Sequence, residues 1–174
     1  MAGTTLIVGG ARSGKSTFAL SIAEKEYSRR VFIATATAID DEMKKRIEEH
    51  REERGNGYTT IEEEVHLTEA LKNVPDTTEV IVVDCFTVWL GNVFFHCGDD
   101  AVAVKERVDK LIAFLPEVTC DLILVTNEVG CGIVPNNDLA RSFRDMCGYL
   151  NRGLAEKADT VYLCSCGIPV KIKS

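Results

Sequence analysis

The chain has 174 residues, of which 45% are hydrophobic and 27% are charged. The length is that of one domain and excludes a large multidomain protein. The composition is that of a globular domain and excludes disordered, collagenous and coiled-coil proteins. The 20 Lys+Arg against 27 Asp+Glu give a net charge of −7 without any basic cluster, so we expect no nucleic-acid partner. We expect a single domain over residues 1–174.

Short apolar segments alternate along the chain with segments of helical period, which is typical of an α/β fold with a mostly parallel sheet. Because the strands are continuously apolar, we expect helices on both faces of that sheet. The predicted elements are Thr4–Val8 (strand), Lys15–Tyr27 (helix), Arg30–Thr35 (strand), Asp40–Arg54 (helix), Glu79–Cys85 (strand), Val102–Leu115 (helix), Asp121–Thr126 (strand), Leu139–Lys157 (helix) and Thr160–Lys173, an edge hairpin that turns at Gly167.

The segment after the first predicted strand matches the phosphate-binding pattern GxxxxGK[ST] and leads into a predicted helix. Glycines let backbone N–H groups surround a phosphate, and Lys15 would reach the outer phosphates, while Ser16 would hold Mg²⁺. The alternative is a glycine-rich turn that matches by chance. This phosphate loop comprises Gly9, Gly10, Ala11, Arg12, Ser13, Gly14, Lys15 and Ser16.

A phosphate loop usually works with a carboxylate at the end of a neighbouring apolar strand. Asp84 follows four apolar residues, so we expect it to share the Mg²⁺ ion with Ser16. The alternative is an acidic residue that merely ends a strand, since this pattern is common.

His50 lies in the second predicted helix, with Arg46 and Arg54 one turn on either side. Two cations beside an imidazole can bind phosphate, and they favour the neutral form that attacks phosphorus. Glu49 and Glu53 weaken this argument. From the residues alone, the favoured interpretation is a solvated, charged helix with an incidental histidine.

Other polar residues receive weaker predictions. His66 and His96 are expected to be packing or surface histidines. A glycine-rich loop after the fourth predicted strand brings Glu128 to the edge where α/β sheets bind ligands. In the helix after this loop, Arg141 and Arg144 are expected more often on the surface than as phosphate clamps.

The seven cysteines are odd in number, follow no signal peptide and lack paired metal-ligand spacing. We therefore expect free thiols in a reducing cytoplasm. No apolar segment approaches the ~20 residues of a membrane span, so we expect a soluble protein.

Motifs spread over nearly the whole chain carry a resemblance to one enzyme family. They are Gly9–Ser16, Ile33–Ala36, Asp40–Met43 with Arg46, Ile47 and His50, Thr126–Gly130, Gly132–Pro135, Leu139–Arg141, Phe143–Asp145, Gly167 and Val170–Lys173. Through them the chain resembles the bifunctional adenosylcobinamide kinase/adenosylcobinamide-phosphate guanylyltransferase family of cobalamin biosynthesis.

The resemblance implies a RecA-like P-loop domain that forms a homotrimer and catalyses two reactions. The first phosphorylates the aminopropanol hydroxyl of adenosylcobinamide with ATP or GTP. The second transfers GMP from GTP to adenosylcobinamide phosphate, which releases pyrophosphate and gives adenosylcobinamide-GDP. In the family, a histidine in an Arg-Ile-x-x-His stretch carries GMP covalently, and this stretch assigns that role to His50. The implied nucleotide contacts are the phosphate loop with Ala34, Thr35, Ala36, Arg51, Glu52, Glu53, Arg54, Glu62 and Asp84.

Two other functions also fit a phosphate loop. A different small-molecule kinase would need no nucleophilic histidine and would form no nucleotidylated enzyme. A nucleotide-sensing switch would hydrolyse its nucleotide slowly and bind a partner in only one nucleotide state.

Overall fold

The structure, a computed structural model, describes residues 2–37 and 41–174, apart from the side chains at positions 42, 43, 46, 49, 50 and 53. A seven-stranded sheet with the order β3-β2-β4-β5-β1-β6-β7 runs through these residues. The first six strands are parallel, and β7 pairs antiparallel with β6 at one edge. The strands are β1 (Thr4–Gly9), β2 (Arg30–Ala34), β3 (Thr59–Glu62), β4 (Val80–Asp84), β5 (Asp121–Asn127), β6 (Thr160–Ser165) and β7 (Ile168–Lys173).

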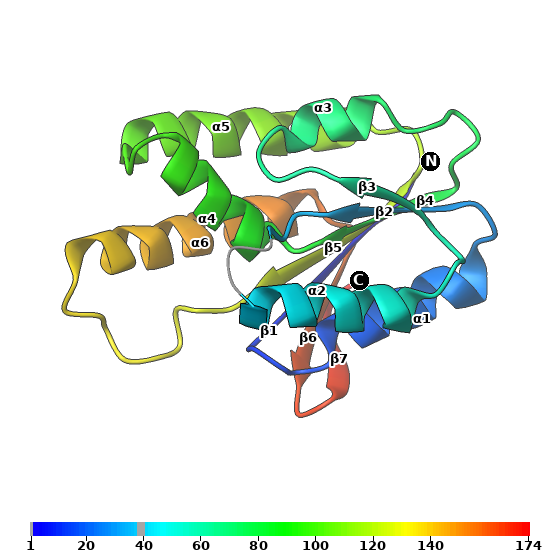
Figure 1. Cartoon of the computed structure of the whole chain (residues 1–174), viewed down its shortest axis with the longest axis horizontal. Coiled ribbons are helices and arrows are strands. Elements are labelled where there is room, and N and C mark those ends of the chain that lie inside the picture. Colours follow the sequence, from blue (N-terminus) through cyan, green and yellow to red (C-terminus); the bar gives the residue numbers. More distant parts are fainter. Residues whose placement is uncertain (1, 38–40) are drawn as a thin grey trace.

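Helices cover both faces of the sheet (Figure 1). One face carries α1 (Lys15–Glu26) and α2 (Asp41–Arg54), and the other carries α3 (Leu67–Lys72), α4 (Phe86–His96), α5 (Ala101–Phe114) and α6 (Asp138–Lys157). A short 3-10 turn, Leu115–Glu117, follows α5. In the part of the chain that the structure describes, no helix combines the length and the apolar character that crossing a membrane requires.

Alternate residues of the central strands belong to two separate cores. In β4, Ile81 and Val83 pack in the core under α3 to α6, whereas Val80 and Val82 pack in the core under α1. All four side chains are fully buried. Burial on both faces explains why the central strands are continuously apolar instead of alternating with polar residues.

The predicted fold class is confirmed. The mostly parallel sheet has helices on both faces and ends in an edge hairpin whose turn lies at Cys166 and Gly167. Each predicted strand and helix is present with bounds shifted by one residue at most, although Asp40, the predicted start of α2, lies outside the described residues.

Three elements, β3, α3 and α4, lie outside the predicted set. The sequence of α4 is rich in aromatic and β-branched residues, which favour strands. Its buried residues nevertheless recur at helical spacing, and this spacing is the signal that identifies a helix: Phe86, Trp89, Leu90, Val93 and Phe94. The edge strand β3 has only four residues, most of them exposed, and so carries no periodic apolar pattern.

The histidines and cysteines behave largely as predicted. His66 and His96 are both exposed, and their ring centroids lie 5.9 Å apart. All seven cysteines are free thiols, and five of them are buried or half-buried. The other two, Cys131 and Cys166, are exposed and lie in loops.

Candidate active site

The phosphate loop connects β1 to α1 at the carboxyl edge of the parallel strands. Two of its glycines are required by the backbone. A Cβ at Gly9 would lie 2.3 Å from the carbonyl oxygen of Cys164, and Gly14 has a φ of 88° where it caps α1. The first glycine of Gly-x-x-x-x-Gly thus allows the close approach of β6, and the second allows the left-handed turn before α1.

Lys15 lies inside the loop, with a side chain that is only slightly exposed. Its Nζ donates to the carbonyl oxygen of Gly10 at 2.5 Å and lies 3.4 Å from Ser13 Oγ. Burial lowers the pKa of Lys15, while the charge of Asp84 acts in the opposite direction. The ammonium group is therefore held where the loop encloses an anion, within the electrostatic reach of Asp84.

The turn of the β6–β7 hairpin packs against the phosphate loop. The N–H of Gly167 donates to the carbonyl oxygen of Ser13 at 3.1 Å, and a Cβ at Gly14 would lie 3.3 Å from Gly167 Cα. The rings of Phe18 in α1 and Tyr162 in β6 pack edge to face, with their centroids 5.0 Å apart. Gly167 is among the motifs noted in the sequence, but its contact with Ser13 is not visible there, because the two residues are distant in the chain.

Asp84 ends β4, which is separated from β1 by β5 alone. It aligns with Val125 of β5, and Asn127 of the same strand aligns with Gly9. Asp84 and Ser16 offer a carboxylate and a hydroxyl at one edge of the sheet. These are the oxygen ligands that Mg²⁺ takes together with substrate phosphates, so the residues fit this metal. Among the described residues, no group of three or more His, Cys, Asp or Glu side chains gathers as a metal site.

Thr35 follows β2 and is completely buried. Its Oγ1 donates to the carbonyl oxygen of Cys85 at 2.8 Å and accepts from the N–H of Cys85 at 2.9 Å. Its own N–H donates to the backbone carbonyl oxygen of Asp84 at 3.2 Å, and its carbonyl oxygen accepts from Asn92 Nδ2 of α4 at 2.8 Å. Thr35 thus uses its polar groups to hold the backbone at Asp84, which makes it a positioning residue for that carboxylate.

A second polar network fixes the end of β5. Thr87 Oγ1 accepts from the N–H of Asn127 at 2.8 Å and lies 3.2 Å from Thr126 Oγ1. Asn151 of α6 accepts from Thr126 Oγ1 at 2.7 Å and donates to the carbonyl oxygen of Asn127 at 2.9 Å. Thr126 and Asn127 belong to a motif noted in the sequence, whereas Thr87 and Asn151 do not. Together they align the strand that lies between the phosphate loop and Asp84.

The end of α2 meets the same region. Arg51 forms an ion pair with Glu62 at the end of β3. The guanidinium carbon of Arg54 lies 3.9 Å from the centroid of Phe32, and burial of this side chain lowers its pKa, partly opposed by the charges of Asp84 and Glu62. Arg54 is thus a buried cation near the end of β2.

His50 lies in α2 one helical turn before Arg54, but its side chain is outside the described residues, as are those of Arg46 and Glu53. Of the other predicted nucleotide contacts in this part of the chain, Glu52 is exposed on α2, and Ala34 and Ala36 flank Thr35 at the end of β2.

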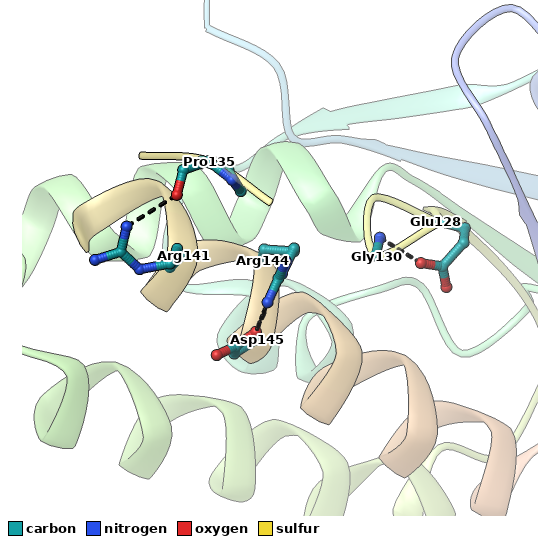
Figure 2. Close-up of polar contacts among 6 residues, drawn as sticks. All are labelled: Glu128, Gly130, Pro135, Arg141, Arg144 and Asp145. Carbon is teal, nitrogen blue, oxygen red and sulfur yellow. Dashed lines mark hydrogen bonds and ion pairs between the residues drawn. The ribbon is translucent and has the colours of Figure 1, made fainter. Parts of the chain in front are cut away.

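The loop after β5 and the start of α6 hold their polar groups by local contacts (Figure 2). Glu128 Oε1 accepts from the N–H of Gly130 at 2.5 Å. Arg141 Nη1 donates to the carbonyl oxygen of Pro135 at 2.9 Å, and Arg144 Nη2 donates to Asp145 at 3.0 Å. This arrangement favours local roles for the two arginines over direct phosphate clamping.

A family model and curated proteins match this chain over nearly its whole length. The family model of cobinamide kinase / cobinamide phosphate guanyltransferase matches residues 5–172. The bifunctional adenosylcobalamin biosynthesis protein CobU of Escherichia coli (strain K12) is 40% identical over 97% of this chain and 98% of its own length. The corresponding protein CobP of Pseudomonas aeruginosa is 39% identical over 97% of this chain and 96% of its own length. Among solved structures, the RadB recombinase is 15% identical, with a TM-score of 0.49 over 92% of this chain and 73% of that chain.

The family match begins within β1, ends within β7 and includes the phosphate loop, Asp84 and the motifs that follow β5. The curated relatives are matched over almost their entire length. This chain therefore belongs to the cobinamide kinase / cobinamide phosphate guanyltransferase family.

Proposed function

We propose that this protein phosphorylates adenosylcobinamide and then converts adenosylcobinamide phosphate to adenosylcobinamide-GDP, with ATP or GTP as the phosphoryl donor and GTP as the GMP donor. The observation that carries this proposal is the family match over residues 5–172 together with a complete phosphate loop that holds Lys15 beside the strand end of Asp84. A single domain, residues 1–174, would carry both activities.

In the kinase step, the backbone of the phosphate loop binds the nucleotide phosphates, and Lys15 stabilises the charge on the transferred group. Ser16 and Asp84 would hold Mg²⁺, which supplies positive charge to the phosphates when bound. The substrate hydroxyl attacks the γ-phosphorus, the bond to the β-phosphate oxygen breaks, and the hydroxyl proton is released. This route uses Lys15 and Asp84 and makes no use of His50.

In the guanylyl transfer, neutral His50 attacks the α-phosphorus of GTP and expels pyrophosphate, which leaves a phosphoramidate on the imidazole. The phosphate of adenosylcobinamide phosphate then attacks the same phosphorus, so the P–N bond breaks and His50 is restored. Arg46 and Arg54 come one helical turn before and after His50 in the sequence of α2, and their positive charges would favour phosphate binding and the neutral imidazole.

The proposed nucleotide site extends from the phosphate loop to the ends of β2, β3 and β4. It comprises the loop residues with Ala34 to Ala36, Arg51 to Arg54, Glu62 and Asp84. For Thr35 we propose the supporting role described above, so a contact at this segment would come from Ala34 or Ala36. We further propose that the protein acts in the cytoplasm as a homotrimer.

Product analysis tests the proposal. We expect purified protein incubated with adenosylcobinamide, GTP and Mg²⁺ to form adenosylcobinamide phosphate first and adenosylcobinamide-GDP later, as resolved by chromatography and mass spectrometry. Formation of the phosphate alone would favour a kinase without guanylyl transfer. Slow GTP hydrolysis with no corrinoid product would favour a nucleotide-sensing switch.

A further inference from the structure

A pocket of about 520 Å³ lies between α4, the loop after β5 and the start of α6. Its wall is mostly apolar and includes Gly91, Phe94, Phe95, Val129, Leu139 and Phe143. The ring centroids of Phe94 and Phe143, which both line it, lie 5.7 Å apart. Phe95 is 89% exposed at its rim, and Ile133 in the neighbouring loop is 97% exposed. Apolar and aromatic side chains that line a pocket and are exposed at its rim are typical of a ligand-binding site.

The pocket begins close to the phosphate loop. Val129 follows Asn127 by two residues, and Asn127 pairs with Gly9. With at most ~3.6 Å per residue and ~4.8 Å between neighbouring strands, the Cα atoms of Val129 and Gly9 are within about 12 Å of each other. A ligand in this pocket could therefore extend a flexible arm to a nucleotide bound at the phosphate loop.

The pocket is also built from motifs that nucleotide binding leaves unused. The segments Thr126–Gly130, Gly132–Pro135, Leu139–Arg141 and Phe143–Asp145 contribute to the family resemblance, yet none of them belongs to the proposed nucleotide site. Six residues from these segments line the pocket: Val129, Pro135, Leu139, Ala140, Phe143 and Arg144. The proposed nucleotide site does not account for binding of the corrinoid substrate, adenosylcobinamide.

The chemistry of the wall matches a corrin macrocycle, which has methyl-bearing apolar faces and carboxamide groups around its rim. Phenylalanine rings supply broad apolar contact for such faces. Arg144 also lines the pocket and is paired with Asp145 near the loop (Figure 2). Its guanidinium carries five N–H donors, so it can bind a carboxamide oxygen in addition to Asp145.

We propose that this pocket binds one side of the corrin ring of adenosylcobinamide, while the aminopropanol arm extends along the loop after β5 to the phosphate loop. This inference rests on the proposed function and adds the place where the corrinoid is held. Because the macrocycle is larger than the pocket, the remainder of the ring would lie against the exposed side chains of Phe95 and Ile133.

Gly91 permits a direct test by filling the pocket. It lies within α4, and a Cβ there would meet only Phe143 Cε2 at an ordinary 3.9 Å, so Gly91→Ala and Gly91→Leu should both fold. We expect Gly91→Leu to bind adenosylcobinamide at least ten-fold more weakly in equilibrium dialysis, read by corrinoid absorbance, whereas Gly91→Ala should bind within two-fold of the unsubstituted protein. Equal affinity of Gly91→Leu and Gly91→Ala would overturn the assignment.

A second pair of variants tests the rim without changing the core. Phe95 lines the pocket, and Val102 on α5 is similarly exposed but lies outside it. We expect Phe95→Ser to weaken corrinoid binding several-fold and Val102→Ser to leave it unchanged. If Phe95→Ser instead changes the sedimentation of the oligomer and leaves corrinoid affinity unchanged, this face is a subunit contact and the proposal is wrong.

The two proposals fail differently. If the unsubstituted protein binds no adenosylcobinamide and forms no corrinoid product, the proposed function itself is wrong. If it binds and converts adenosylcobinamide while Gly91→Leu does so with unchanged KM and kcat, only the location of the corrinoid is wrong. Labelling of each variant by GTP shows whether its nucleotide site is intact.

Discussion

The ammonium group of Lys15 is already positioned to bind a phosphate before a nucleotide is present. Its ammonium group is enclosed by the loop and directed at Gly10 O, so a phosphate would find a cation already in place. Such preorganised charge costs little reorganisation during the reaction and is worth several kcal/mol in a water-excluded site.

Replacement of Lys15 should therefore abolish phosphorylation more than it affects folding. We expect Lys15→Ala to lower the kcat for phosphorylation of adenosylcobinamide at least 100-fold, because the transferred phosphoryl group loses its cation. The rate is measured by chromatography of corrinoid products, and thermal unfolding provides the control. Near-normal turnover by a folded Lys15→Ala protein would contradict the assignment.

Asp84 should act through the metal ion instead. Asp84→Asn is nearly isosteric but has no charge to neutralise Mg²⁺, so we expect a higher Mg²⁺ requirement and at least ten-fold slower phosphorylation, with an unchanged fold. A titration of kinase rate against Mg²⁺ concentration measures both effects. Unchanged titration and rate would mean that Asp84 only ends its strand.

The ends of β2 and β4 are joined by Thr35, whose hydroxyl bridges the N–H and carbonyl oxygen of Cys85. Thr35→Val leaves these buried groups without that partner, and the loss of a buried hydrogen bond costs roughly 1–3 kcal/mol. We expect Thr35→Val to lower the free energy of unfolding by about that amount and to raise the Mg²⁺ concentration for half-maximal kinase rate.

Thr35→Ser separates positioning from packing, because it keeps the hydroxyl and loses only a methyl group. We expect Thr35→Ser to recover the Mg²⁺ dependence of the unsubstituted protein. A purely structural Thr35 would instead show altered stability in Thr35→Val with an unchanged Mg²⁺ titration.

The turn of the β6–β7 hairpin contacts the phosphate loop through Gly167. Gly167 has a φ of 81° in the turn that donates to Ser13, and a side chain there strains the backbone. We expect Gly167→Ala to lower the free energy of unfolding by roughly 1 kcal/mol and to weaken GTP binding several-fold in calorimetric titration. Unchanged GTP affinity would mean that the hairpin turn does not support the phosphate loop.

Much of this arrangement follows from local sequence. The phosphate loop, the apolar strands and the amphipathic α6 have patterns that fix their type within a few residues. In contrast, α4 is built from strand-favouring residues and is helical because its buried side chains fit the core, so local preference favours the wrong element.

The supporting contacts of the site depend on tertiary structure. Gly167 meets Ser13, Thr35 meets Cys85, and Asn151 meets Thr126, at separations of 25 residues or more. No spacing rule in the sequence relates such pairs, since only the strand order brings them together.

The proposed nucleotide site and the pocket beside α4 both lie at the carboxyl edge of the parallel strands. The phosphate loop, Asp84 and the end of α2 provide the proposed nucleotide site, and the loop after β5 leads to the pocket beside α4. We propose that the two reactions share this edge but use different residues: Lys15 for phosphorylation and His50 for guanylyl transfer.

Covalent labelling with GTP that carries radioactive phosphorus at the α-position separates the role of His50 from that of Lys15. We predict label that remains on the protein in denaturing electrophoresis, is lost in acid, survives alkali as a phosphoramidate should, and maps to the peptide with His50. His50→Ala should lose both the label and adenosylcobinamide-GDP formation while it still phosphorylates adenosylcobinamide. Label on a lysine, or adenosylcobinamide-GDP made by His50→Ala, would show that His50 is not the nucleophile.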